Sequence, residues 1–413
     1  MQPAEALPPV RELAQKLKVS PATVAAAYRL LRARGLTAAN GRRGTRVIPR
    51  PPTRARSDLR PVAEGATDLS SGNPDGALLP SLAPALQQLD ATAALYDAPP
   101  LLPSLASFAA AEFEADGIAA AALTAVSGAL DAIERVLREH LRPGDHVALE
   151  DPCFPSVHDL LVAAGYVAVP FAVDDEGPEP ASFEAALRQN CRAAIVTTRG
   201  QNPTGAALTG QRAEKLRAAL RRHPDLLLIE SDPCGPVAGA PPITLVDRSR
   251  HRWAHVKSTA KFLGPDLRVA FVAGDALTIN RVEGRYVLGP RRVSHLLQRL
   301  VLALWSDPSA GRRLARASEV YRHRRTALLT ELAAHGVAAR GASGLNVWVP
   351  VRDESHSVHA LAARGWIVAA GEPFRIQATP GIRITTAALR PEAAPELAAT
   401  LADVLSSVHR PTA

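Results

Sequence analysis

Cysteine is scarce in this sequence, which has only three such residues, Cys153, Cys191 and Cys234. Their number is odd, and their positions share no spacing typical of metal ligands. This pattern argues against a disulfide framework and against a zinc site, and no metal is expected. We therefore expect the chain to work in a reducing cytoplasm.

Long apolar runs are also missing. No uninterrupted apolar stretch reaches the roughly 20 residues that a membrane helix needs, so no membrane partner is expected. The segment from Met1 to Val10 lacks a basic region followed by an apolar core, and it therefore does not look like a secretory signal. Hydrophobic residues make up 47% of the chain and charged residues 21%, which is typical of a globular protein. At 413 residues the chain is too long for one core, so we expect two or three domains.

The excess of positive charge lies at one end of the chain. Residues 1–60 contain 13 Lys/Arg and 3 Asp/Glu, whereas the remaining 353 residues contain 35 and 37. Such a basic block favours a polyanionic partner for the N-terminal segment and leaves the rest of the chain nearly neutral.

The segment after the first prolines has the pattern of two helices joined by a tight turn. Apolar residues at helical spacing predict a helix over Val10–Leu17, and Lys18-Val19 would form the turn. Ser20 is a good N-cap and Pro21 suits the first position of a second helix, which Gly35 would end. This arrangement is typical of a helix-turn-helix.

A short hairpin is predicted to follow. Asn40-Gly41 separates two strand-like runs, which is the strongest short hairpin signal. Arg42 and Arg43 would lie near its tip, where they could reach phosphates or a minor groove. The second helix offers further candidates for contacts in the major groove, namely Ser20, Thr23, Tyr28 and Arg32.

These stretches resemble the winged helix-turn-helix of GntR-type regulators, and the resemblance implies DNA as a partner. It rests on Leu7–Ala14, Val19–Val24, Ala27–Leu31 and Gly44–Val47. That family has a further helix ahead of the Leu-Pro-Pro element, so we expect an N-terminally incomplete domain over residues 1–48. The alternative is a vestigial or structural helical appendage. Residues 49–66 have the composition of a basic, proline-rich linker.

Residues 67–413 alternate apolar strand-like runs with alanine-rich helical stretches, which predicts an α/β domain with a mostly parallel sheet. Ser127-Gly128-Ala129 follows a short strand and opens a helix, a place that favours phosphate. Phe154 lies on a loop after the next predicted strand, where it could stack on a planar ring. Asn202 lies in an Asn-Pro-Thr-Gly turn that closes a strand at the edge where ligands of open α/β sheets bind.

A fourth motif runs from Ser258 to Phe271 and contains Lys261. A lysine amine must lose its proton to attack an aldehyde, so its site has to lower its pKa. Ser258 and Arg268 add a hydroxyl and a guanidinium that can bind a phosphate. Each motif taken alone could serve only the structure, as a turn, a core residue or a surface charge. The four motifs together point specifically to a ligand site.

In their order and spacing the four motifs resemble fold-type I pyridoxal 5′-phosphate (PLP) enzymes of the class I and II aminotransferase group. The resemblance covers about residues 68 to 405 and implies a smaller C-terminal α/β subdomain. It implies Lys261 as the catalytic lysine that forms a Schiff base with PLP, and Arg383 as the clamp for a substrate carboxylate. Asn202 would contact the phenolic oxygen of the cofactor and the substrate. The remaining cofactor contacts it implies are Ser127, Gly128, Ala129, Phe154, Ser258, Arg268, and Tyr96 reaching across a dimer.

One position departs from this family. The family places an aspartate on the pyridine nitrogen at the end of the strand Leu226–Glu230 and a tyrosine shortly afterwards. Here Ser231 aligns with that aspartate, Asp232 follows it, and Cys234 stands near the tyrosine position. Because side chains alternate along a strand, a shift of one residue decides which group meets the ring. We favour Asp232, which would keep the nitrogen protonated and the cofactor a strong electron sink, whereas Ser231 would weaken α-proton chemistry but leave binding intact.

The joined architecture resembles MocR-type transcriptional regulators. That resemblance implies a homodimer that binds operator DNA and senses PLP or an amino-acid or amine effector. A second hypothesis is a working aminotransferase with a vestigial N-terminal remnant, which Lys261 and Arg383 make plausible. A third is a structural protein with an inactive domain, and the departures from the family at Ser231 and Cys234 support it.

Overall fold

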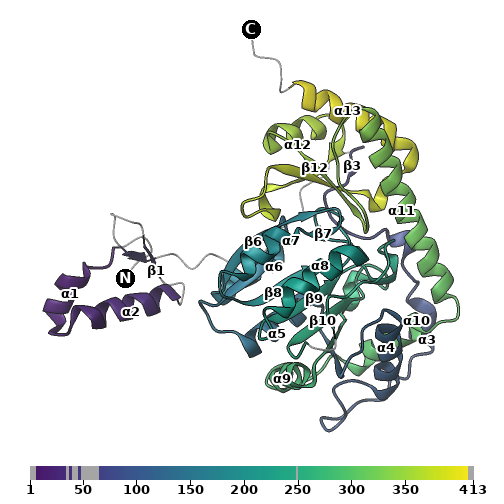
Figure 1. The fold of residues 1–413 in the computed structure, drawn as a ribbon. Coiled ribbons are helices and arrows are strands. Elements are labelled where there is room, and N and C mark those ends of the chain that lie inside the picture. The colour runs from purple at the N-terminus through teal and green to yellow at the C-terminus, as the bar shows by residue number, and fades with distance from the viewer. Residues whose placement is uncertain (1–5, 34–36, 40–44, 48–64, 248–249, 408–413) are drawn as a thin grey trace.

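The structure is a computed structural model that describes residues 6–33, 37–39, 45–47, 65–247 and 250–407 (Figure 1). The N-terminal unit consists of two helices and a two-stranded antiparallel sheet. Lys18 ends the first helix in the left-handed conformation, with φ 55°, at the turn that the sequence predicts. The helix-turn-helix and the antiparallel pairing of the two short strands are therefore confirmed, whereas the predicted Asn40-Gly41 turn lies outside the described residues. The bounds are α1 (Val10–Leu17), α2 (Pro21–Ala33), β1 (Thr37–Ala39) and β2 (Thr45–Val47).

Tyr28 lies in the small core of this unit and not on its DNA-facing surface. Its side chain is 6% exposed and packs with Ala14 and Val24. Its hydroxyl donates a hydrogen bond to the carbonyl oxygen of Pro8 at 2.7 Å. The expectation that Tyr28 is an exposed side chain of the second helix is wrong, because a residue four positions after Val24 shares its helix face.

The other candidates for DNA contact divide into two groups. Ser20 and Thr23 are exposed at the start of α2, where the Ser20 hydroxyl caps the Thr23 amide at 3.1 Å. The side chain of Arg32 lies outside the described part of the structure, as do Arg42 and Arg43.

An eight-stranded sheet forms the centre of the main unit, in the order β4-β11-β10-β9-β8-β5-β6-β7. Among these strands β7 and β11 run antiparallel to their neighbours, and the others are parallel to one another. The predicted mostly parallel sheet is therefore confirmed. Its strands are β4 (Ala122–Val126), β5 (His146–Asp151), β6 (Val167–Asp174), β7 (Gly177–Pro178), β8 (Cys191–Thr197), β9 (Leu227–Asp232), β10 (Trp253–Ser258) and β11 (Ala270–Gly274).

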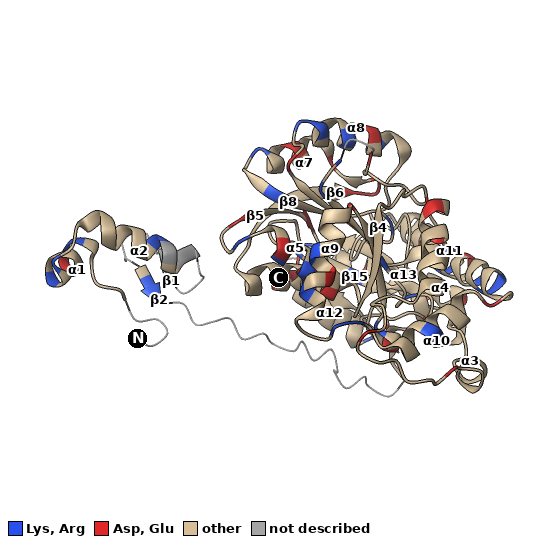
Figure 2. Ribbon diagram, turned by 90° about the horizontal axis from the view of Figure 1, so that it is seen from below, with Lys and Arg blue, Asp and Glu red and all other residues tan. Residues whose placement is uncertain are grey.

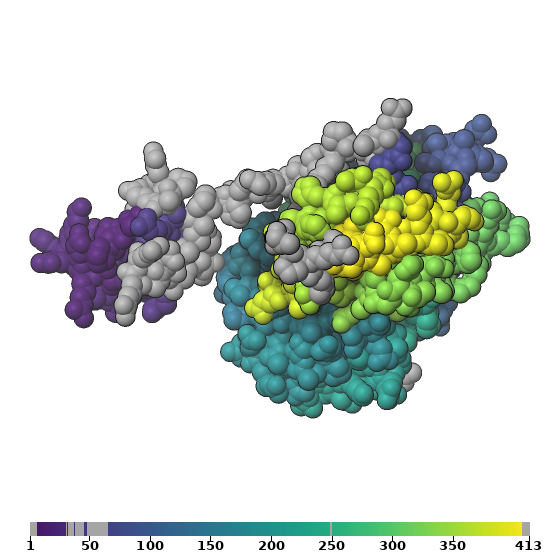
Figure 3. All heavy atoms as spheres, turned by 90° about the horizontal axis from the view of Figure 1, so that it is seen from above, coloured from purple at the N-terminus to yellow at the C-terminus, as the bar shows by residue number. Residues whose placement is uncertain are grey.

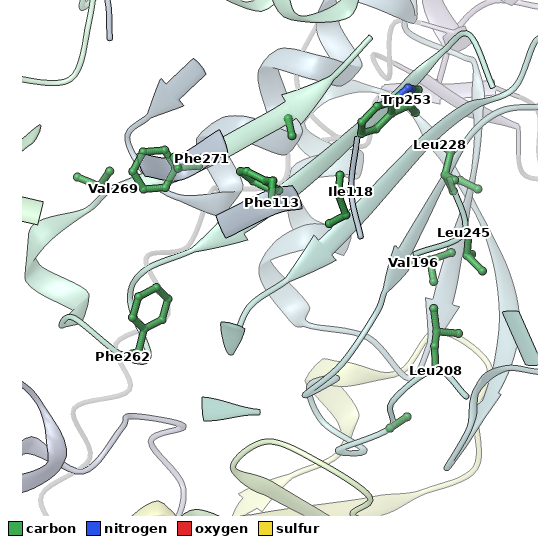
Figure 4. Packing of buried hydrophobic residues seen from close by; sticks show 14 of the residues in the cluster. Phe113, Ile118, Val196, Leu208, Leu228, Leu245, Trp253, Phe262, Val269 and Phe271 are labelled. Carbon is green, nitrogen blue, oxygen red and sulfur yellow. The ribbon is translucent and has the colours of Figure 1, made fainter. Parts of the chain in front are cut away.

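Helices cover both faces of this sheet, which explains why its central strands are apolar along their length. On the first face, Phe271 and Trp253 of the sheet share a core with Phe113 of the helical layer (Figure 4). The helices of this layer are α3 (Ala83–Gln87), α4 (Pro103–Ala115), α7 (Pro180–Leu187), α8 (Gly210–Arg221) and α10 (His295–Trp305). The second face packs against Ile133, Leu161 and Ile279 from α5 (Ala129–His140), α6 (Pro155–Ala164) and α9 (Ala276–Val287).

A smaller C-terminal lobe has its own core, as the resemblance implied. It contains a three-stranded antiparallel sheet, in the order β12-β15-β14, and a parallel pair of β13 with β3. In the space-filling view this green-to-yellow lobe lies against the teal part of the main unit (Figure 3). Its elements are β3 (Thr67–Asp68), α11 (Ala310–Ala334), β12 (Asn346–Pro350), α12 (Glu354–Ala362), β13 (Trp366–Ile367), β14 (Ala369–Ala370), β15 (Gly381–Thr385) and α13 (Ala394–Ser407).

Charged residues of both signs are interspersed along the ribbon of the main unit (Figure 2). The three cysteines are free thiols, and two of them are buried. Within the described residues, no helix is long and apolar enough to span a bilayer, and no cluster of His, Cys, Asp and Glu could hold a metal ion.

Candidate functional site

The predicted site residues gather at one edge of the large sheet. The parallel strands β4, β5, β8, β9 and β10 all end at this edge, because their carboxyl ends point the same way. Ser127 follows β4, Phe154 follows β5, Asn202 follows β8 and Lys261 follows β10. The topology therefore brings together motifs that lie far apart in the sequence, at the edge where such sheets bind ligands.

Gly128 and Arg268 form a cradle at the start of α5. Gly128 has φ 100°, and a Cβ atom added to it would lie 2.7 Å from Nη2 of Arg268. Arg268 is itself left-handed, with φ 50°, and its Nη2 donates to the carbonyl oxygen of Ser127 at 3.4 Å. A guanidinium therefore stands beside the start of a helix, an arrangement that suits a phosphate.

Hydroxyl groups and the helix start are fixed by further contacts. The Ser127 hydroxyl lies 2.7 Å from that of Tyr286, and the Ser127 amide donates to the carboxylate of Asp131 at 3.0 Å. The Ser258 side chain is buried, and its oxygen accepts the Ala260 amide at 3.3 Å. These contacts hold two hydroxyl-bearing residues at the sheet edge.

Lys261 is half-buried, and its Nζ donates to the carbonyl oxygen of Gly72 at 2.6 Å. Burial lowers the pKa of its amine, and the positive charge of Arg383 lowers that pKa further, while Cys234 acts in the opposite direction. A lowered pKa increases the fraction of neutral amine, which is the form that attacks an aldehyde.

Arg383 lies on β15 of the C-terminal lobe and reaches the same site. Its Nη1 donates to Oδ1 of Asn202 at 3.1 Å, and its Nη2 contacts the carbonyl oxygen of Ser70. Its guanidinium also stands 4.8 Å from the ring centre of Phe374. The structure therefore brings Asn202, Arg383 and the segment beneath Lys261 together, as the resemblance implied.

The end of β9 separates Ser231 from Asp232. Ser231 pairs with Val256 on β10, whereas Asp232 pairs with Lys257. The Asp232 carboxylate is 1% exposed and accepts hydrogen bonds from Arg199 at 2.7 and 3.0 Å. The structure does not bring Asp232 to the face that carries Ser258, because adjacent residues of a strand point to opposite faces. Asp232 therefore faces Arg199, and Ser231 shares the face of Ser258.

Two predicted aromatic contacts are more exposed than the rest of the site. Phe154 precedes α6 and is 41% exposed. Tyr96 is 81% exposed, between α3 and α4, with the Arg291 guanidinium 5.4 Å from the centre of its ring. A tyrosine this exposed within one chain is consistent with a role toward a second chain.

Several residues of the site were missed at the level of sequence. Gly72 and Ser70 offer backbone oxygens, which carry no sequence signal, and Tyr286 is 159 residues away from Ser127. Asp131 had a usable signal, because an acidic residue in the first turn of a helix commonly binds amides at the helix start.

The residues at this edge fit PLP. The Gly128–Arg268 cradle suits its phosphate, and the neutral form of Lys261 suits its aldehyde. The Asn202 side chain lies at the same edge, beside Arg383. Fold and site together define a fold-type I PLP-dependent transferase domain behind a winged helix-turn-helix.

Comparisons with known proteins support this class. Residues 64–401 match the family described as aminotransferase class I and II, and residues 1–47 match the bacterial regulatory proteins of the gntR family. The vitamin B6 salvage pathway transcriptional repressor PtsJ of Salmonella typhimurium is 40% identical over 97% of this chain and 94% of its own length. The transcriptional regulator TauR of Rhodobacter capsulatus is 27% identical over 64% of this chain and 56% of its own.

Solved structures agree on the fold. The kynurenine aminotransferase of Pyrococcus horikoshii has a TM-score of 0.77 at 19% identity, covering 84% of this chain and 93% of its own. The α-aminoadipate aminotransferase LysN of Thermus thermophilus has a TM-score of 0.73 at 22% identity, covering 84% and 93%.

The chain therefore belongs to the class I and II aminotransferase family, in the MocR-type branch that carries a GntR-type DNA-binding unit. It is a DNA-binding transcriptional regulator with an aminotransferase-like domain, and the cofactor of that domain is PLP.

Proposed function

We propose that this regulator holds PLP covalently on Lys261 and that the bound cofactor is the signal that changes its binding to DNA. The placement of the Lys261 amine carries the proposal. Lys261 is half-buried, its amine donates a hydrogen bond to Gly72 at 2.6 Å, and burial lowers its pKa. The name of the 40% identical relative, a repressor of vitamin B6 salvage, supports vitamin B6 metabolism as the process under control.

Each group at the sheet edge has a distinct task in this proposal. Arg268, Ser127 and Ser258 bind the phosphate through charge and hydroxyl groups. When bound, PLP supplies an aldehyde that bonds reversibly to a primary amine and a ring that draws electrons from it. Lys261 supplies the amine from the protein side, and Asn202 orients the ring by donating to its phenolic oxygen.

Arg383 gives the site a second specificity, for an amino acid or a similar amine. Its guanidinium is buried, and Asn202 and Ser70 fix its orientation. A carboxylate would find a pre-oriented bidentate donor there, because the fork of a guanidinium matches two carboxylate oxygens. An effector with an amine and a carboxylate would thus reach Lys261 and Arg383 together.

We further propose that the chain works as a homodimer. The supporting feature is a set of exposed apolar side chains that we call the dimer patch, namely Leu95, Tyr96, Leu288 and Leu296, whose exposed fractions are 72, 81, 78 and 45%. The segment that carries Leu95 and Tyr96 is held by hydrogen bonds from Arg292, which precedes α10, and from His295, which begins it. Monomeric proteins rarely expose such clusters, and a two-fold dimer matches paired DNA half-sites.

The experiment compares the native chain with Lys261→Ala and with the control Lys215→Ala, an exposed lysine on α8. Titration with PLP should give a visible absorbance band in the native chain and in the control, but not in Lys261→Ala. Binding of upstream DNA from its own gene should change on addition of PLP in the first two proteins and stay constant in the third. An identical band in all three would contradict the assignment of Lys261.

A working aminotransferase is the second candidate, and the pairing of Arg383 with Asn202 beside Lys261 favours it. Steady turnover of an amino donor with an α-keto acid, without any effect of PLP on DNA binding, would decide for it.

A further inference from the structure

The last residues of β9 face two different environments. Ser231 lies opposite Thr197 of β8 and Val256 of β10. Val256 belongs to the core beneath α5, the helix whose start forms the Gly128–Arg268 cradle. Ser258 is two residues after Val256 and therefore points to that same face. Ser231, Thr197 and Ser258 thus share the face of the phosphate-binding residues.

Ser231 is also open to a ligand. Leu227 to Glu230 and Asp232 are buried, whereas Ser231 is partly exposed, and so is its neighbour Thr197. The ends of these two adjacent strands are therefore accessible at the carboxyl edge of the sheet, the edge that Ser127 and Lys261 also follow.

Asp232 is held on the opposite face by a buried network of charges. One carboxylate oxygen binds Nε and Nη2 of Arg199, and the other accepts the Gly235 amide at 2.7 Å. Arg199 also forms an ion pair with Asp116 at 3.2 Å, and Lys257 forms an ion pair with Asp116 at 2.7 Å. Turning Asp232 toward the cofactor would leave the buried Arg199 without its nearest counter-charge, which is strongly unfavourable.

We propose that Ser231, and not a carboxylate, meets the pyridine nitrogen of bound PLP, so that the site retains the cofactor but activates it weakly. This inference rests on the proposed binding of PLP at Lys261. A hydroxyl does not stabilise a positive charge on the ring nitrogen as a carboxylate does, so the cofactor draws electrons less strongly and an α-proton leaves a bound amine slowly. Binding persists, because Lys261, Arg268 and Ser127 supply it. The domain is thereby suited to sensing a ligand without consuming it.

The first test needs no mutation. PLP labelled with ¹⁵N in its ring is bound to the native full-length chain, and the ¹⁵N chemical shift reports whether the ring nitrogen carries a proton. We expect the shift of an unprotonated nitrogen at pH 7. A protonated nitrogen would overturn the inference and leave PLP binding untouched, whereas absence of binding would overturn the proposed function itself.

The second test compares Ser231→Asp with Asp232→Asn. Ser231→Asp should protonate the labelled nitrogen and speed the single-turnover reaction of bound PLP with L-alanine by about tenfold or more, the effect of at least one pKa unit. Asp232→Asn should leave the shift and the rate as in the native chain but lower the thermal unfolding midpoint. If Asp232→Asn does not fold, Ser231→Asp decides alone, and an unchanged ¹⁵N shift in that variant would contradict the inference.

Discussion

At the scale of single residues, Gly128 shows how a backbone conformation can define a binding site. Its φ of 100° is unfavourable for any residue with a side chain, and a Cβ atom would clash with the guanidinium of Arg268. Substitution should therefore disturb both the cradle and the arginine that completes it. Arg268 also has a positive φ, which is unfavourable for a residue with a side chain, so two residues of positive φ meet at the point where the phosphate is expected.

We predict that Gly128→Ala weakens PLP binding. Holding alanine in this conformation costs about 1–3 kcal/mol, and relaxation of the strain displaces the phosphate ligands, so the affinity should fall about tenfold or more. A fluorescence titration with PLP measures it. Gly210→Ala is the matched control, because Gly210 begins a helix and has no atom within 4 Å of an added Cβ. Equal affinities of the two variants for PLP would contradict the assignment of the Gly128–Arg268 cradle to the phosphate.

Which of Ser231 and Asp232 faces the ligand could not be predicted from the sequence. The motif located the end of the strand, but which of two neighbours faces the ligand depends on the register of β9 between β8 and β10. Arg199, whose contact holds the Asp232 side chain on its face of the sheet, is 33 residues away in the sequence, and no local pattern predicts this contact.

At the scale of elements, most of the fold was predictable because strands, turns and helix starts are local. Apolar runs that end in Ser127-Gly128 or in the Asn202 turn predict where a parallel strand stops, and the structure places those stops at one sheet edge. Tyr28 was misjudged for a related reason. Its aromatic ring with a polar tip suits both a core and a surface, and the choice depends on packing between α1 and α2.

We predict that Tyr28 is needed for folding of the N-terminal unit and not for direct contact with DNA. Tyr28→Phe removes one hydrogen bond, to Pro8, and should cost about 1 kcal/mol of unfolding free energy while DNA binding persists. Tyr28→Ala empties a core whose buried members are Ala14, Val24 and Tyr28, at a cost of about 3–5 kcal/mol, and should abolish DNA binding.

Circular dichroism and a gel-shift assay on the full chain distinguish these outcomes, and PLP binding by the main unit serves as the internal control. Loss of DNA binding in a fully folded Tyr28→Phe variant would contradict this prediction and would indicate that the tyrosine hydroxyl contacts DNA.

At the scale of the whole molecule, the proposed dimer patch would connect the ligand site to DNA recognition. Tyr96 is 81% exposed in one chain, and the resemblance to aminotransferases implies a contact of this residue with the cofactor. Both observations agree if Tyr96 completes the site of a second chain. Dimer formation would then place two N-terminal units for paired half-sites and bring both cofactor sites to completion in the same step.

We predict that Leu288→Asp separates the dimer. Leu288 is 78% exposed in one chain, so an aspartate there is harmless to the monomer, but an interface would bury its charge without a partner. Light scattering coupled to size exclusion should give half the native mass, and the affinities for PLP and for DNA with two half-sites should both fall. Val162→Asp on α6, also an exposed apolar position, should leave mass and affinities unchanged. A Leu288→Asp protein that keeps the native mass would show that the two chains meet through another surface, and Tyr96 would then lose its proposed role across the dimer.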